Sequence, residues 1–161
     1  MPTKQKFTTN SVAPQKFRPH GRVEFSSQGN ILISEVIGPF NVELVNAVAN
    51  TEVDRFEEFI ARGKWGDVIV FRESAMASHE ALAAVTANVR KNIENAHHPS
   101  ATALVLAPCV EGAKLMARRH LQCFLDGGYT QAGIPIAVFE DEDEAINWLK
   151  SVLNKTNSSD L

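Results

Sequence analysis

The sequence predicts a single α/β domain with a mixed, mostly parallel sheet of about five strands and flanking helices. Residues 68–71 form an uninterrupted apolar run without the alternation of a half-exposed strand, so both faces of this strand should be covered. Apolar residues then recur at helical spacing from Leu82 to Ile93, which indicates a strand followed by a crossover helix. A chain of 161 residues with 44% hydrophobic content is long enough to bury a sizeable core.

Two strands are predicted ahead of this unit, over residues 22–26 and 31–37, and residues 27–30 suit a hairpin between them. The next helix should begin after an N-cap at Asn41, bend or break near Asn50 and Thr51, and end at Gly63. Its buried stripe is predicted from five apolar residues at helical spacing: Val45, Val48, Phe56, Phe59 and Ile60.

After the central unit, residues 101–107 form a second buried strand, and the helix that follows it should end at Gly127 and Gly128. The last strand spans 134–139, and Pro135 favours an edge position because proline cannot donate to a ladder. Asp141 and Glu144 have the spacing of a capping box for a final helix. The order is therefore ββαβαβαβα, and each short connection implies a right-handed parallel crossover.

The two ends of the chain differ from the domain in composition. Residues 1–20 contain three prolines, with lysine and arginine but no acidic residue, which predicts a flexible basic arm. Residues 155–161 should form a frayed C-terminal end. The domain itself is expected over residues 21–154.

Charge and hydropathy exclude several classes of protein. The net charge of −3 and the lack of a lysine and arginine stripe argue against nucleic-acid binding. Apolar runs such as 101–107 are far shorter than the roughly 20 residues that span a bilayer, and residues 1–20 lack the apolar core of a secretory signal. We therefore expect a cytoplasmic protein without a transmembrane segment.

No cofactor or metal site is predicted. The chain has nine glycines, but none form the spacing of a phosphate-binding loop. His97 and His98 are adjacent and would point in different directions from a helix end, so they suit a solvated helix terminus better than a shared metal. The acidic run 140–144 lies at a predicted helix start, where negative charge is stabilising without a metal.

The order of elements over residues 22–154 and the ending IPIAVFEDEDEAINWL resemble the STAS family of sulfate transporter and anti-sigma factor antagonist domains, in particular its SpoIIAA-like branch. This resemblance implies a regulatory or binding module more than an enzyme. In the antagonists of the family, a serine at the start of the helix after the central strand is phosphorylated. The matching segment here is SAMASHEAL, which makes Ser78 the positional candidate, with Ala77 where those proteins have aspartate.

The default binding surface is the rim at the carboxyl ends of the parallel strands, where open α/β sheets bind ligands. Its predicted segments are residues 39–41, 72–78 and 108–111. The residues themselves favour an N-cap role for Ser78 over a regulatory phosphate. The candidate ligand or regulatory residues on this rim are Asn41, Arg72, Glu73, Ser74, Ser78 and Cys109.

Cys109 is the most reactive candidate, since a helix N-terminus stabilises a thiolate. It is predicted at the start of a helix and Cys123 at its end, about 21 Å away, so both should be free thiols. No pairing signature with a histidine base accompanies Cys109, and an inert cysteine is the simpler interpretation.

Three functions stay open at this point. The first is a STAS-like regulatory, protein-interaction or ligand-binding module. The second is a small cysteine-dependent enzyme or redox-responsive protein using Cys109, which should hold a histidine or carboxylate near the sulfur. The third is a carrier of an apolar small ligand, which should have a closed apolar cavity between sheet and helices. An edge strand or exposed apolar residues on the first long helix could support a homodimer.

Overall fold

The computed structural model describes residues 7–8 and 21–158 and confirms the α/β fold. One mixed sheet has the strand order β1-β2-β3-β4-β5-β6, in which β1–β2 and β2–β3 are antiparallel and the remaining pairs are parallel. The strands are β1 (Phe7–Thr8), β2 (Arg22–Gln28), β3 (Ile31–Ile37), β4 (Gly66–Arg72), β5 (Ala101–Val105) and β6 (Ile136–Phe139). β6 lies at the edge, as Pro135 predicts. The two-residue strand β1 falls within the predicted N-terminal arm, and the rest of that arm is outside the described residues.

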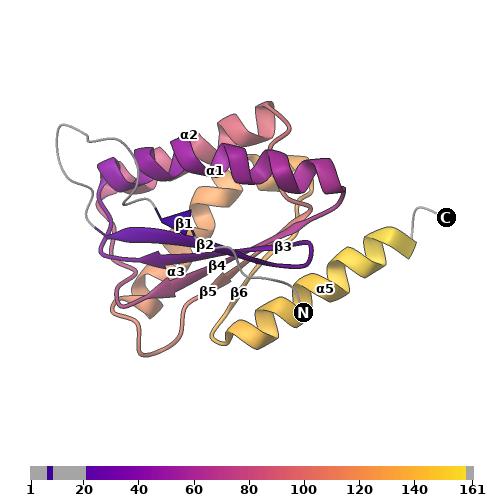
Figure 1. Ribbon diagram of the computed structural model, residues 1–161. Helices are drawn as coiled ribbons and strands as arrows, with labels where there is room; N and C mark the ends of the chain where they lie inside the picture. Colours follow the sequence, from indigo (N-terminus) through magenta and orange to yellow (C-terminus); the bar gives the residue numbers. More distant parts are fainter. Residues whose placement is uncertain (1–6, 9–20, 159–161) are drawn as a thin grey trace.

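The helices cover the two faces of the sheet unequally. Figure 1 shows α1 and α2 side by side on one face and α5 on the opposite face. The helical segments are α1 (Val42–Arg62), α2 (His79–Glu94), α3 (Ala113–Phe124), the π-helical turn η2 (Leu125–Tyr129), α4 (Thr130–Ala132) and α5 (Glu142–Ser158). None of the helices in the described ranges combines the length and hydropathy needed to cross a bilayer.

The central strand β4 sends alternate side chains to the two faces. Val68 and Val70 pack into the core under α5. Asp67, Ile69 and Phe71 point to the opposite face, towards α1 and α2. The same apolar strand therefore supports two different environments, one of which contains a buried carboxyl group.

The predicted helix caps are present. Asn41 Oδ1 accepts a hydrogen bond from the Leu44 amide at 3.0 Å, and Asp141 Oδ2 accepts one from the Glu144 amide at 3.0 Å. Each side chain satisfies an amide that has no partner within its helix. Gly63 ends α1 with a positive φ of 115°, as predicted.

The sequence predicts a bend or break in α1 near Asn50 and Thr51, and the break is absent. The helix is continuous through Asn50 and Thr51, because the Thr51 hydroxyl donates back to the carbonyl of Ala47 at 3.2 Å and stays satisfied inside the helix. Ile60, predicted in the buried stripe, is 37% exposed. In the last turns of α1 the buried positions are Phe56 and Phe59 instead.

The sequence predicts that the helix of α3 ends at Gly127 and Gly128, and Gly128 does have a left-handed φ of 125°, but the helical segment kinks there instead of stopping. The chain continues as η2 and α4, and the left-handed residue that ends this helical segment is Gly133, with φ 69°. Gly127 serves close packing instead, since a Cβ there would lie 2.6 Å from Val89 Cγ1. Glycine is needed at this position so that η2 can contact α2.

Candidate functional site

A cavity of about 140 Å³ lies between the sheet and helices α1 and α2. Its walls come from segments far apart in the sequence, including Val36 of β3, Ile69 of β4, Val48 of α1 and Val85 of α2. Most of the lining side chains are apolar. An engineered apolar cavity of about 150 Å³ binds benzene, so this cavity has room for a small organic molecule.

The walls of the cavity contain many short side chains. Valine and alanine line it from α1 and α2, for example Val45 and Ala81, and they do not reach far enough to fill the space in front of β4. Protein interiors are close-packed, with few voids larger than a water molecule. The cavity therefore exceeds an ordinary packing defect.

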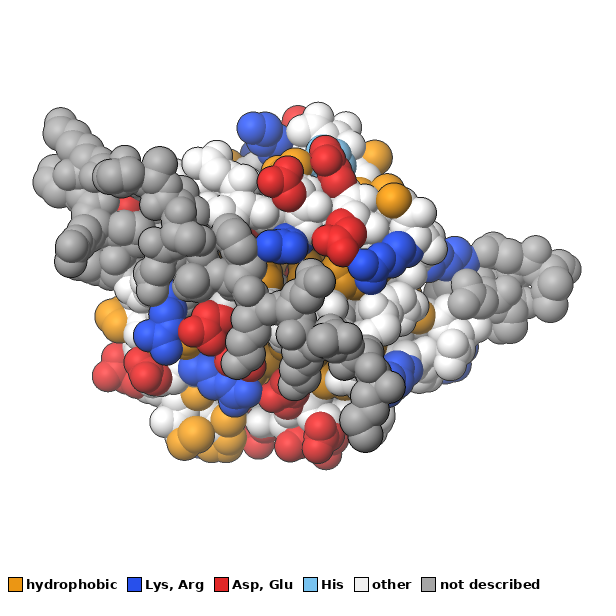
Figure 2. Space-filling view, viewed as in Figure 1, with side chains coloured by type: hydrophobic (Ala, Val, Ile, Leu, Met, Phe, Trp, Pro, Cys, Tyr) orange, Lys and Arg blue, Asp and Glu red, His pale blue; other side chains and the backbone are white. Residues whose placement is uncertain are grey.

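The outer surface offers no comparable apolar site in the view of Figure 2. Acidic and basic side chains are interspersed there, and apolar side chains occur in small groups. Neither sign of charge gathers into one large patch on this face. The cavity is therefore the feature on which a functional proposal can be built.

Polar groups gather at one end of the cavity, near the amino end of β4. Glu52 of α1 and Asp67 of β4 line it together with Asn88 and Asn92 of α2. The Nδ2 groups of both asparagines donate to Oε1 of Glu52, that of Asn92 at 3.2 Å. Ser34 Oγ donates to Oδ1 of Asp67 at 3.5 Å. Three secondary-structure elements thus bring two carboxyl groups to one place.

Each of the two carboxyl groups keeps one oxygen without a protein partner. Oε2 of Glu52 and Oδ2 of Asp67 form no hydrogen bond with any of the described residues. No side-chain nitrogen or oxygen in the described part of the chain is both enclosed and unpartnered. Both oxygens are therefore accessible, and for Asp67, which is only 6% exposed, the accessible space is the cavity that it lines.

Burial changes the protonation of both acids. Loss of water around Asp67 raises its pKa to about 8, and the nearby negative charge of Glu52 acts in the same direction. Burial also raises the pKa of Glu52, although the hydrogen bonds from Asn88 and Asn92 oppose the rise. At neutral pH Asp67 is therefore mostly protonated, and the carboxyl group can either donate or accept a hydrogen bond.

Further titratable groups line the same cavity. Tyr129 Oη lies 2.8 Å from Thr102 Oγ1, and burial raises the pKa of the phenol. His97 and His98 come from the α2–β5 loop, and His97 Nε2 lies 3.8 Å from Glu57 Oε1. Among the described residues, no group of three potential ligands could hold a metal ion.

His120 of α3 lies near the other end of the cavity, where it is 5% exposed. Its Nε2 donates to the Ala75 carbonyl at 2.8 Å, and its ring centroid is 4.4 Å from that of Phe71. Burial lowers the pKa of His120, so the ring is neutral at pH 7. We assign it a packing role.

The three segments of the predicted rim do meet in space. Isolated bridges join Phe40 to Ala77 and Ser74 to Glu111. Ser78 Oγ accepts a hydrogen bond from the Ala81 amide at 3.1 Å, so Ser78 is the N-cap of α2. Ser74 Oγ donates to Glu111 Oε1 at 2.8 Å.

The remaining rim candidates have structural contacts or lie apart. Arg72 forms an ion pair with Glu142 at 3.0 Å, and Glu73 adopts a left-handed φ of 62° at the turn after β4. Asn41 caps α1. Cys109 is an exposed free thiol ahead of α3, with no hydrogen-bond partner among the described residues and no place in the cavity lining. Cys123 is also free, as predicted.

The polar end of the cavity was not predicted from the sequence. One signal for it exists, because Asp67 directly precedes the apolar run 68–71 and lies in the same covered strand. Asn88 and Asn92 are a second signal, since a spacing of i and i+4 places both amides on one side of α2. Glu52 has no such signal, since acidic residues are common on helix surfaces.

The chain was compared with known protein families, with curated proteins and with solved structures, and no match was found.

Proposed function

We propose that this chain binds a small, largely apolar molecule in the cavity between the sheet and helices α1 and α2, and acts as a carrier or sensor of it. The observation that supports the proposal is the cavity itself, with its volume of about 140 Å³ and its apolar lining. A carrier of an apolar small ligand is expected to have a closed apolar cavity, and this one is largely apolar but partly open to the surface. The volume suits a molecule near the size of a substituted benzene.

Binding in this place would connect three elements of the fold. Val36 of β3, Val48 of α1 and Val85 of α2 all line the cavity, so a ligand would contact the sheet and both helices at once. A ligand that binds only the folded chain stabilises it by mass action. Occupancy would therefore favour one arrangement of α1 and α2, which suits a regulatory or sensing role.

Ligand binding in the cavity leaves room for several further roles. Membership of the STAS family, a regulatory or protein-interaction role, a cytoplasmic location and a homodimer are compatible with ligand binding. We do not extend the proposal to chemistry at Cys109, because its sulfur has no base within hydrogen-bond distance among the described residues.

Toluene is a suitable first probe, because it is close to benzene in size and has no polar group. We expect toluene to shift the NMR signals of residues around the cavity, such as Val48, Ile69 and Val85, and to raise the melting temperature. Val85→Phe should fill the cavity and abolish both effects, since Val85 lines it.

The matched control is Val138→Phe, the same substitution at a residue of β6 that is 38% exposed and lies outside the cavity lining. This variant should bind toluene like the unmodified chain. The proposal fails if toluene produces no saturable shift, or if Val85→Phe binds it as well as Val138→Phe does.

A further inference from the structure

The cavity has an uneven distribution of charge. Two carboxyl groups, those of Glu52 and Asp67, line its polar end, whereas no lysine or arginine is among its described lining residues. Each carboxyl has one oxygen held by a protein donor and one accessible oxygen without a partner. The site therefore offers hydrogen-bond acceptors to whatever enters it, and negative charge once its acids are ionised.

We infer that the natural ligand is an apolar amine, whose protonated nitrogen lies between Glu52 and Asp67 while its hydrocarbon part fills the cavity. This inference rests on the proposed function, because it concerns the ligand of the same cavity. It adds the chemical class of the polar group.

The chemistry of an ammonium group matches the two free oxygens. An ammonium has three N–H donors and no acceptor, so it can donate to Oε2 of Glu52 and to Oδ2 of Asp67 together. Buried charges are stable only when they are paired and hydrogen-bonded. A positive nitrogen would relieve the repulsion between the two acids, while a ligand carboxylate would increase it.

The protein groups around Glu52 and Asp67 also favour an amine as the ligand. The donors that the protein already supplies are the amides of Asn88 and Asn92 and the hydroxyl of Ser34, and all of them are neutral. They orient the carboxyl groups without neutralising them. At neutral pH a proton neutralises Asp67, and no lysine or arginine among the described lining residues could take its place. A cation that pairs with the ionised acids would therefore come from the ligand.

Binding should be coupled to proton release. Asp67 has a pKa of about 8 without a cation beside it, so at neutral pH an ammonium must displace its proton. The affinity for an amine is then expected to rise from pH 6 to pH 8. Glu52, His97, His98 and Tyr129 also line the cavity, and Glu57 lies beside His97, so variants must separate the contribution of Asp67.

The test uses four probes with one aromatic ring and different substituents: toluene, benzyl alcohol, benzylamine and benzoate. We expect benzylamine to bind at least about tenfold more tightly than benzyl alcohol at pH 8, as a charge-assisted hydrogen bond allows. Benzoate should bind most weakly. Calorimetry in buffers of different ionisation enthalpy should show proton release with benzylamine below pH 8 and none with toluene.

Two variants identify the groups that recognise nitrogen. Asp67→Asn and Glu52→Gln each keep the shape of the side chain and remove its charge, so each should reduce the preference for benzylamine over benzyl alcohol at least about fivefold. Toluene titrations of both variants show whether the cavity is still open. Using two variants guards against a folding defect in one of them.

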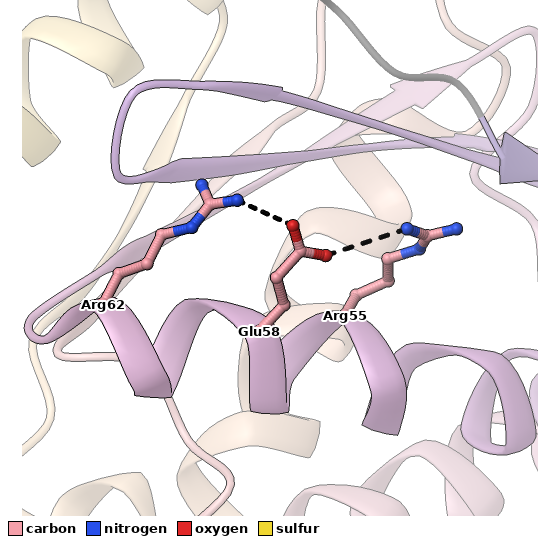
Figure 3. A network of polar contacts seen from close by, with 3 residues as sticks. All are labelled: Arg55, Glu58 and Arg62. Carbon is pink, nitrogen blue, oxygen red and sulfur yellow. Dashed lines mark hydrogen bonds and ion pairs between the residues drawn. The ribbon is translucent and has the colours of Figure 1, made fainter.

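Glu58→Gln is the matched control on α1. Glu58 is ion-paired with Arg55 at 3.9 Å and with Arg62 at 2.6 Å on an exposed part of the helix (Figure 3). It does not line the cavity, so this variant should keep the full preference for benzylamine.

The outcomes distinguish this inference from the proposed function. If toluene and benzyl alcohol bind as tightly as benzylamine, the cavity binds apolar molecules but the amine assignment is wrong. If benzoate binds most tightly, the assignment is also wrong. If none of the four probes binds, both the inference and the proposed function fail.

Discussion

The two faces of the sheet are built differently around the same strand. On the α5 face, Val68 and Val70 are 0% and 1% exposed and pack with alanines and with Leu149. On the α1–α2 face, the alternate residues of β4 are Asp67, Ile69 and Phe71, and they border a cavity. One face is a dry, filled core and the other contains a void and a buried acid.

The close packing of the α5 face has a local cause. A Cβ at Gly66 would lie 3.3 Å from Leu149 Cδ2 and from Leu153 Cδ1, so α5 lies close to the backbone of β4. Ala101, Ala103 and Ala145 are each 0% exposed in the same layer. Small residues allow a helix to approach the sheet closely and leave no room for a ligand.

This comparison indicates a division of roles between the faces. A void and a buried carboxyl group both reduce stability, by lost contacts and by desolvation respectively. Such features persist where they serve a function, and the α5 face then supplies compensating stability. The contrast can be tested by substitutions on either side of β4.

The largest loss of stability is expected from Leu149→Ala on the α5 face. Leu149 is 0% exposed in a filled core, so truncation should lower the free energy of unfolding by about 3–4 kcal/mol. Val48→Ala, beside the existing cavity, removes a half-buried side chain and should cost about 1 kcal/mol. Urea denaturation monitored by circular dichroism measures both. Equal losses would show that the two faces do not differ as described.

The second effect concerns pH and the charge of Asp67. The pKa of Asp67 is about 8 in the folded chain and 3.8 as its ordinary value, so between these values the folded state binds more protons than the unfolded state. The contribution of this group to stability therefore falls as pH rises, by at most about 1.4 kcal/mol per pH unit. The contribution becomes constant only well below pH 3.8, where the group is protonated in both states.

Asp67→Asn should remove this dependence. Relative to the variant, the unmodified chain is expected to lose about 2 kcal/mol between pH 6 and pH 8, since the curve flattens near the pKa. The difference between the two denaturation series cancels contributions of groups that do not interact with Asp67, such as His120, whereas Glu52 interacts with Asp67 and its contribution stays in the difference. Parallel pH curves for both chains would contradict the assignment of a raised pKa to Asp67.

The difference between local sequence signals and contacts made only in the folded chain explains how much of the structure could be predicted from the sequence. The strands and most helix limits follow from local signals, such as the apolar run 68–71 and the caps at Asn41 and Ser78. Two features depend on contacts that composition does not encode. The Thr51 hydroxyl bonds within its own helix, which runs on without a break, and the helix kinks at Gly128 but continues, with Gly127 packed against Val89.

The cavity depends on distances between elements, so it could not be predicted from residue types. Val48 and Val85 have the spacing of ordinary core residues, and only the separation of the helices from β4 leaves the space open. The rim at the carboxyl ends of the strands was a sound geometric expectation, and its segments do meet. The polar end of the cavity lies instead near the amino end of β4, at Asp67.

The smallest effect concerns Ser78, which lies on that rim but not in the cavity lining, although Phe40 and Ala77 of the rim do line the cavity. Ser78 caps α2 at the carboxyl ends of the strands, so Ser78→Ala should lower the free energy of unfolding by about 1 kcal/mol. It does not line the cavity, and the affinity for toluene should stay within about twofold of the unmodified chain. Ser78→Asp, which keeps an acceptor at the N-cap, should restore most of the stability. A large change in toluene affinity with Ser78→Ala would instead mean that the rim and the cavity are coupled through α2, since Ala81, which Ser78 caps, is part of the cavity wall.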